Sequence, residues 1–214
     1  MRRIGLALTL GLLCSGCFTT AGGHLAPISP EKPDTQLSLQ STVGDFSMTL
    51  EGGKLVTSEF MGRQLNESLL KVWKDKGYIK KYANVDKGAF TSEVPYHVTL
   101  SGSQYGESSI VMQVISGLTL TLIPYTVDTK WDIQYTLEDA RTGARYSAGV
   151  EDSTSEIVEF LLLPALPWAF RGQQQTFERM ADHLYQQLHE QGAFRGGEAE
   201  AGPPSTPLLA PSSP

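Results

Sequence analysis

Residues 130–150 read KWDIQYTLEDARTGARYSAGV, and this stretch decides the fold class. Its first half alternates polar residues with apolar ones, namely Trp131, Ile133, Tyr135 and Leu137. A turn follows at residues 140–143, and the alternation continues through Tyr146, Ala148 and Val150. Such alternation is typical of strands with one buried face and one solvated face. The stretch therefore predicts a β-hairpin with one wet face.

An amphipathic helix is expected before this hairpin, over residues 58–76. Its apolar residues fall on one stripe at helical spacing: Met61, Leu65, Leu69, Val72 and Trp73. Ser58 or Thr57 can cap its start, and Gly77 supplies the stop. Lysines gather near its end, and they have two interpretations, a basic contact patch or a solvated face that compensates the helix dipole.

A second helix is expected over residues 173–191, with its stripe formed by Phe177, Met180, Ala181, Leu184 and Leu188. Strands are expected at residues 37–50, 78–85 and 94–105. This element order predicts an α+β fold, a two-layer sandwich. Two amphipathic helices would cover one face of a mixed or antiparallel sheet.

Two further stretches are rich in apolar residues. In residues 109–125, the spacing of Leu118, Leu120 and Leu122 predicts a strand, whereas residues 110–115 fit either a strand or a short buried helix. Residues 157–170 are broken by Pro164 and Pro167. Residues 157–170 have two interpretations, a segment buried beneath the core or an exposed apolar loop that contacts a partner, a ligand or a membrane. The contact residues of such a loop would be Leu161, Leu162, Leu163, Trp168 and Phe170.

The first seventeen residues combine a positive start, a short apolar run and small residues before Cys17. This pattern resembles the signal peptide of bacterial lipoproteins, in which the cysteine is acylated and becomes the mature N-terminus. Cys14 stands where family members usually carry leucine, and it is a weaker acylation site because bulky Leu13 precedes it. The alternative is an ordinary cleaved signal. Only Cys14 and Cys17 occur in the chain, so cleavage leaves no disulfide partner.

The resemblance implies a division of the chain into a signal peptide at residues 1–16 and a lipidated Cys17. A flexible tether would follow at residues 17–36, then a single periplasmic domain at residues 37–194 and a disordered tail at residues 195–214. Phe18 follows the cysteine, and lipoproteins kept in the inner membrane often carry aspartate there. The implied location is therefore the outer membrane, facing the periplasm.

Charge argues against nucleic acid as a partner. The whole chain has 17 basic and 23 acidic residues. Loss of Arg2 and Arg3 with the signal leaves 15 basic residues and a net charge of −8. Such an acidic balance disfavours binding to phosphate backbones.

The sequence contains no familiar catalytic signature. It lacks the nucleophile-elbow, phosphate-loop, dinucleotide and zinc-protease motifs. No histidines stand at metal-ligand spacing, and His97 with Ser101 has no placed acid to complete a triad. We therefore expect no enzyme activity, no cofactor and no metal.

The order of elements, with Leu69-Leu70 in a helix that ends at Gly77-Tyr78, resembles the small periplasmic domains related to the TolB N-terminal domain. That two-layer fold is used by several envelope lipoproteins. The tether, the single compact domain and the absence of catalytic groupings favour an accessory or scaffold protein that binds an envelope protein partner in assembly or transport. The alternative is a carrier of a small apolar ligand or lipid, with residues 161–170 and the strand expected in residues 109–125 as its cavity walls.

Overall fold

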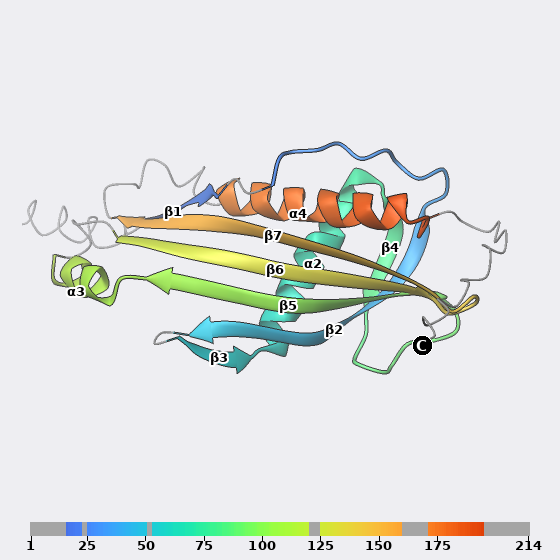
Figure 1. Ribbon diagram of the computed structural model, residues 1–214, viewed down its shortest axis with the longest axis horizontal. Coiled ribbons are helices and arrows are strands. Elements are labelled where there is room, and N and C mark those ends of the chain that lie inside the picture. Colours follow the sequence, from blue (N-terminus) through green and yellow to red (C-terminus); the bar gives the residue numbers. More distant parts are fainter. Residues whose placement is uncertain (1–15, 23–24, 51–52, 120–124, 160–170, 195–214) are drawn as a thin grey trace, which may run out of the picture.

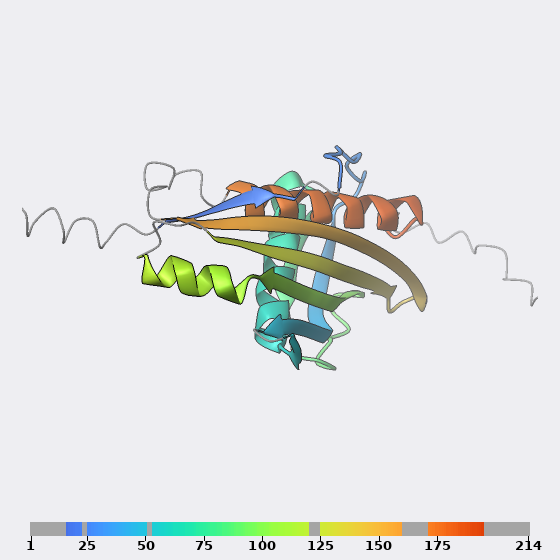
Figure 2. The same cartoon turned by 60° about the vertical axis from the view of Figure 1, so that its left-hand side comes forward.

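The computed structural model describes residues 16–22, 25–50, 53–119, 125–159 and 171–194. Within these ranges one mixed sheet is covered on one face by two long helices (Figures 1 and 2). The α+β prediction with two helices on one face is confirmed. The elements are β1 Gly16–Ala21, β2 Leu37–Leu50, β3 Lys54–Thr57, α2 Glu59–Lys76, β4 Ile79–Asn84, β5 Tyr96–Ser108, α3 Ile110–Leu118, β6 Tyr125–Asp139, β7 Ala144–Glu159 and α4 Arg171–Glu190.

The sheet has the strand order β1-β7-β6-β5-β2-β3, and β4 pairs with β2 beside this path. Strand β2 is parallel to β4 and β5, whereas the other pairs are antiparallel. The sheet is therefore mixed. The hairpin that the alternating stretch predicts is β6–β7, and it closes where Asp139 pairs with Ala144.

The core lies between the two helices and the alternating residues of β5, β6 and β7. Trp73 of α2 is fully buried at its centre, and its ring packs edge-on against Tyr135 of β6 and Phe194. Helix α4 contributes Met180, Ala181, Leu184 and Leu188, all with no exposed surface. The predicted stripes therefore face the sheet, because only that orientation removes both apolar faces from water.

The ends of α2 follow the predicted signals. Ser58 is the N-cap, and its side-chain oxygen accepts a hydrogen bond from the Met61 backbone amide at 3.4 Å. Gly77 ends the helix with a positive φ of 78°, a conformation that glycine adopts without a steric cost.

The structure differs from the expected tether at its start. Residues 16–21 form β1, an edge strand antiparallel to β7 in which Cys17 lies opposite Val158. Farther along, the Tyr185 hydroxyl donates to the Glu31 carbonyl at 3.1 Å, and Leu25 packs against the core. Backbone pairing at a sheet edge needs no apolar alternation, so the sequence pattern missed it.

The structure also differs in residues 109–125. Leu118 belongs to helix α3 rather than to a strand, and α3 is exposed rather than buried. Ser109 starts this helix, because its hydroxyl accepts from the Met112 amide at 3.4 Å.

Several predictions lie outside the described residues. These are the signal peptide before Gly16, residues 120–124, the apolar residues Leu161, Leu162, Leu163, Trp168 and Phe170, and the tail at residues 195–214. None of the helices in the described part of the chain is both long and apolar enough to cross a membrane.

Candidate functional site

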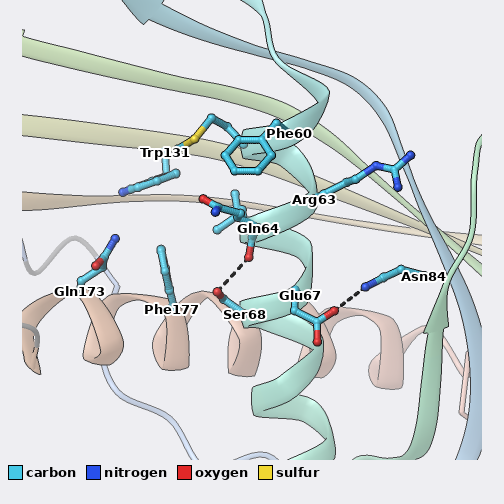
Figure 3. Close-up of a pocket in the computed structure, with 11 residues that line it drawn as sticks. Phe60, Arg63, Gln64, Glu67, Ser68, Asn84, Trp131, Gln173 and Phe177 are labelled. Carbon is cyan, nitrogen blue, oxygen red and sulfur yellow. Dashed lines mark hydrogen bonds between the residues drawn. The ribbon is translucent and has the colours of Figure 1, made fainter.

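A groove of about 660 Å³ lies between α2, α4 and strand β6 (Figure 3). The N-terminal half of α2 forms one wall, the first turns of α4 form another, and β6 supplies Trp131. The described residues that line it are Phe60, Met61, Arg63, Gln64, Leu65, Glu67, Ser68, Asn84, Trp131, Gln173 and Phe177. The groove lies where α2 and α4, which pack on the same face of the sheet, run in different directions (Figure 1).

Aromatic side chains dominate one part of the groove. The ring of Phe177 meets Trp131 edge-on, with 5.5 Å between the ring centroids. Phe60 is 67% exposed, although it stands beside half-buried Met61. A large apolar residue left this exposed at the mouth of a groove is a candidate contact residue, because burying it against a partner would be favourable.

Trp131, which lines the groove, also has an unsatisfied hydrogen-bond donor. Its side chain is 6% exposed, and its indole Nε1–H has no hydrogen-bond partner among the described residues. Gln104, its neighbour in register on β5, likewise has a buried side-chain oxygen without a partner. In Figure 3 the indole nitrogen lies on the side of Gln173. A buried polar group without a partner costs free energy, so this donor lowers the stability of the fold at this point.

A polar network closes the opposite side. Buried Asn66 donates to the Ser41 hydroxyl at 2.8 Å and accepts from the Tyr135 hydroxyl at 2.8 Å. At the surface, Glu67 accepts hydrogen bonds from the Tyr82 hydroxyl and from the Asn84 amide (Figure 3). Burial raises the pKa of Tyr82 and also that of Tyr135 well above the ordinary tyrosine value. Both tyrosines therefore remain neutral donors, and they hold this wall in one arrangement.

An ion pair next to the groove fixes α4 on the sheet. Arg179 donates to Asp152 of β7 at 2.8 Å, and the Asp152 side chain is fully buried. Arg179 also donates to the Thr176 hydroxyl at 3.3 Å. Phe177 lies between Thr176 and Arg179 in the sequence. Attachment of this turn to the sheet therefore holds the Phe177 ring against Trp131.

The structure places the predicted site residues apart from this groove. Cys17 lies in the edge strand β1 and does not line the groove, and the apolar residues between Leu161 and Phe170 are outside the described ranges. The ring of His97 stacks on Phe90, and its Nε2 lies 3.0 Å from the Val94 carbonyl. Within the described ranges, no group of three or more histidine, cysteine or acidic residues is placed to hold a metal.

The carrier alternative named residues 109–125 as cavity walls. The described part of that stretch instead forms exposed α3, and none of it lines the groove. Sequence reasoning missed the groove itself, because its walls come from three elements far apart in the chain. The usable signal was Phe60, an aromatic residue beside the predicted stripe of α2 rather than on it.

Comparisons with known proteins found similar solved structures and no match in sequence. No protein-family model matches the chain, and no curated protein matches it in sequence. Among solved structures, it is similar to a candidate neuraminyllactose-binding hemagglutinin homolog from Helicobacter pylori, with 10% identity, a TM-score of 0.44 and coverage of 79% of this chain and 94% of that chain. It is also similar to a DUF330 protein from Xanthomonas campestris, with 11% identity, a TM-score of 0.40 and coverage of 80% and 95%. A third is the PelC dodecamer from Paraburkholderia phytofirmans, with 10% identity, a TM-score of 0.37 and coverage of 80% and 96%. No residue role or activity is carried over from these proteins.

Proposed function

We propose that this chain is a lipid-anchored envelope protein that binds a protein partner through the groove between α2, α4 and β6, and that it is an accessory protein rather than an enzyme. The anchor rests on the lipoprotein-type signal, with Cys17 as the acylated residue and Phe18 favouring the outer membrane. Binding rests on one observation, the 67% exposure of Phe60 at a groove that Trp131 and Phe177 also line.

The composition of the groove suits a protein segment. Phe60, Met61 and Phe177 offer an apolar contact area, and Gln64, Glu67 and Gln173 surround it with amides and a carboxylate. Recognition sites commonly combine an apolar centre with a polar rim. A partner side chain that packs against Phe60 would remove this exposed ring from water.

The position of Cys17 supports an anchor close to the body. Residues 16–21 pair directly with β7, so the mature chain would begin inside the sheet rather than at the end of a long tether. The groove would then stay near the membrane surface, within reach of other envelope proteins.

Site-specific crosslinking tests the binding site. A photo-reactive phenylalanine analogue at Phe60 is expected to crosslink one defined envelope protein, identified by mass spectrometry. Leu55 on β3 is the matched control, because it is 65% exposed and does not line the groove. Equal products from both positions, or none from Phe60, would contradict a partner in this groove.

A carrier of a small apolar ligand is the second candidate, and the groove volume favours it. About 660 Å³ lies within the range of pockets that hold small molecules, roughly 300–1,000 Å³. In that case native mass spectrometry of the purified protein would show a co-purifying lipid, and Phe177→Ala would reduce its occupancy. A ligand-free mass together with a Phe60 crosslink would favour the protein partner.

A further inference from the structure

Helix α3 presents its apolar side to solvent. One helical stripe consists of four exposed apolar residues. Their exposed fractions are 67% for Val111, 56% for Val114, 36% for Ile115 and 81% for Leu118. On its other side Ser116 is fully buried. This is the reverse of an ordinary surface helix, which turns apolar residues toward the core. An apolar stripe directed outward is expected only where something other than water covers it.

The chain immediately before and after α3 carries no charge. The chain from Ser108 to Val127 contains no acidic or basic residue, and Glu107 and Asp128 stand at its two ends. Helix α3 has nine residues, so it is about 14 Å long. It is too short to cross a hydrocarbon layer of about 30 Å, so its apolar stripe can enter the bilayer from one side only.

The strand register places α3 at the same end of the sheet as Cys17. Ser108, the last residue before the loop into α3, pairs with Val127, which pairs with Glu156, which pairs with Thr19. Cys17 extends two residues beyond that row, toward the end where α3 stands (Figures 1 and 2). Three strand spacings separate β5 from β1, which is about 14 Å.

We propose that α3 is an interfacial helix that lies in the lipid bilayer surface beside the acylated Cys17. This inference rests on the proposed lipid anchor. The acyl chains fix the start of β1 at the membrane, and the apolar stripe of α3 enters the same leaflet. Two contacts at one end of the sheet orient the body, so that the β6–β7 turn points away from the bilayer.

The occupant is a lipid surface rather than a second protein because of this shared end. A protein anchored through Cys17 necessarily brings neighbouring surface to the lipid, and α3 is the neighbouring apolar surface in the described part of the chain. Since α3 has no basic residue, its attachment does not depend on anionic lipid, and it should persist at high salt.

A single-cysteine label tests the proposal on the acylated full chain in phosphatidylcholine–phosphatidylethanolamine vesicles. After signal cleavage and acylation of Cys17, Leu118→Cys or Val111→Cys supplies the one free thiol. An environment-sensitive dye at either position is expected to shift to shorter wavelength, and lipids with spin-labelled acyl chains should quench it several-fold.

The matched control is Ala140→Cys at the β6–β7 turn. It is exposed, and β6 has fifteen residues, so the turn lies about 50 Å from α3. Dye at Ala140 is expected to remain in water and unquenched by the lipids. Dye at Leu118 as water-exposed as at Ala140 would overturn the proposal, and so would a shielded dye that lipid-borne quenchers do not reach.

The intact mass of the same sample reports acylation separately. A sample without acyl mass contradicts the proposed anchor. An acylated, vesicle-bound sample with Leu118 in water contradicts only the placement of α3.

Discussion

The indole Nε1–H of Trp73 donates a hydrogen bond to the backbone carbonyl of Ala181 at 2.7 Å, and so joins α2 to α4. Trp73 is fully buried, and its ring stands edge-on to Tyr135 and Tyr185. Because one residue contacts both helices and the sheet, it sets the spacing between α2 and α4. The groove near the start of both helices depends on that spacing.

Trp73→Phe is expected to lower the free energy of unfolding by about 1–3 kcal/mol, because the hydrogen bond is lost and the smaller ring leaves space. Urea unfolding followed by circular dichroism measures it. Phe60→Leu is the control, and a substitution at this 67% exposed position should change stability by less than about 0.5 kcal/mol. Equal effects would contradict a central role for Trp73.

Gly102 on β5 is expected to tolerate no side chain. Its φ is +146°, and a Cβ there would lie 2.1 Å from the Asp132 carbonyl oxygen. Gly102→Ala should therefore lower the free energy of unfolding by about 1–3 kcal/mol, since the backbone must shift. Gly106 on the same strand has open space around it, so Gly106→Ala should be nearly neutral in the same unfolding experiment. A neutral Gly102→Ala would show that β5 runs differently here.

Asp139 is expected to make stability depend on pH. Hydrogen bonds from the Arg141 side chain lower the pKa of this carboxyl below its ordinary value in the folded chain. A lowered folded pKa means that the charged form stabilises the fold above the unfolded pKa of about 3.9. This contribution is lost as the pH falls through the folded pKa.

Thermal unfolding of wild type and Asp139→Asn measures this effect. The wild type should be the more stable of the two at pH 7, and the difference should shrink below pH 4. A difference that stays constant down to pH 2 would contradict the interaction with Arg141.

Lys76 and Tyr78 satisfy a buried carboxylate on α4. Lys76 donates to Asp182 at 2.6 Å and the Tyr78 hydroxyl donates to it at 3.0 Å, while the Asp182 side chain is 5% exposed. Lys76→Met is expected to lower the free energy of unfolding by about 1–3 kcal/mol. The loss should be smaller than for a fully buried ion pair, because the Lys76 side chain is 35% exposed. Lys74→Met, at an exposed position of the same turn, should cost much less. Chemical denaturation of both variants compares them, and equal costs would refute the role of Lys76.

Local patterns predicted the fold where side-chain periodicity and backbone structure agree. Residues 37–50 form β2 as expected, and Ser58 and Gly77 bound α2 as expected. The β6–β7 hairpin extends beyond the predicted stretch because pairing continues along both strands. Its buried face follows the alternation from Trp131 to Leu137.

Three features could not be obtained from periodicity. Strand β1 is held by backbone pairing, which leaves no side-chain pattern. Helix α3 exposes its apolar stripe, so the rule that apolar stripes face the core gave the wrong burial. Asn66 looks like a surface residue because it is polar, yet it is buried and hydrogen-bonded to Ser41 and Tyr135.

The candidate site was equally hidden, because Phe60, Trp131 and Phe177 meet only through tertiary packing. The sequence indicated instead the anchor at Cys17, which the described fold places at one end of the sheet.

Intact mass spectrometry of the protein extracted from bacterial membranes tests the lipid anchor most directly. We expect a chain that begins at Cys17 and carries a diacylglyceryl group and a further acyl chain, whereas Cys17→Ser should remain unprocessed and without acyl mass. A wild-type mass equal to the bare polypeptide, or unchanged processing and membrane retention of Cys17→Ser, would contradict the account.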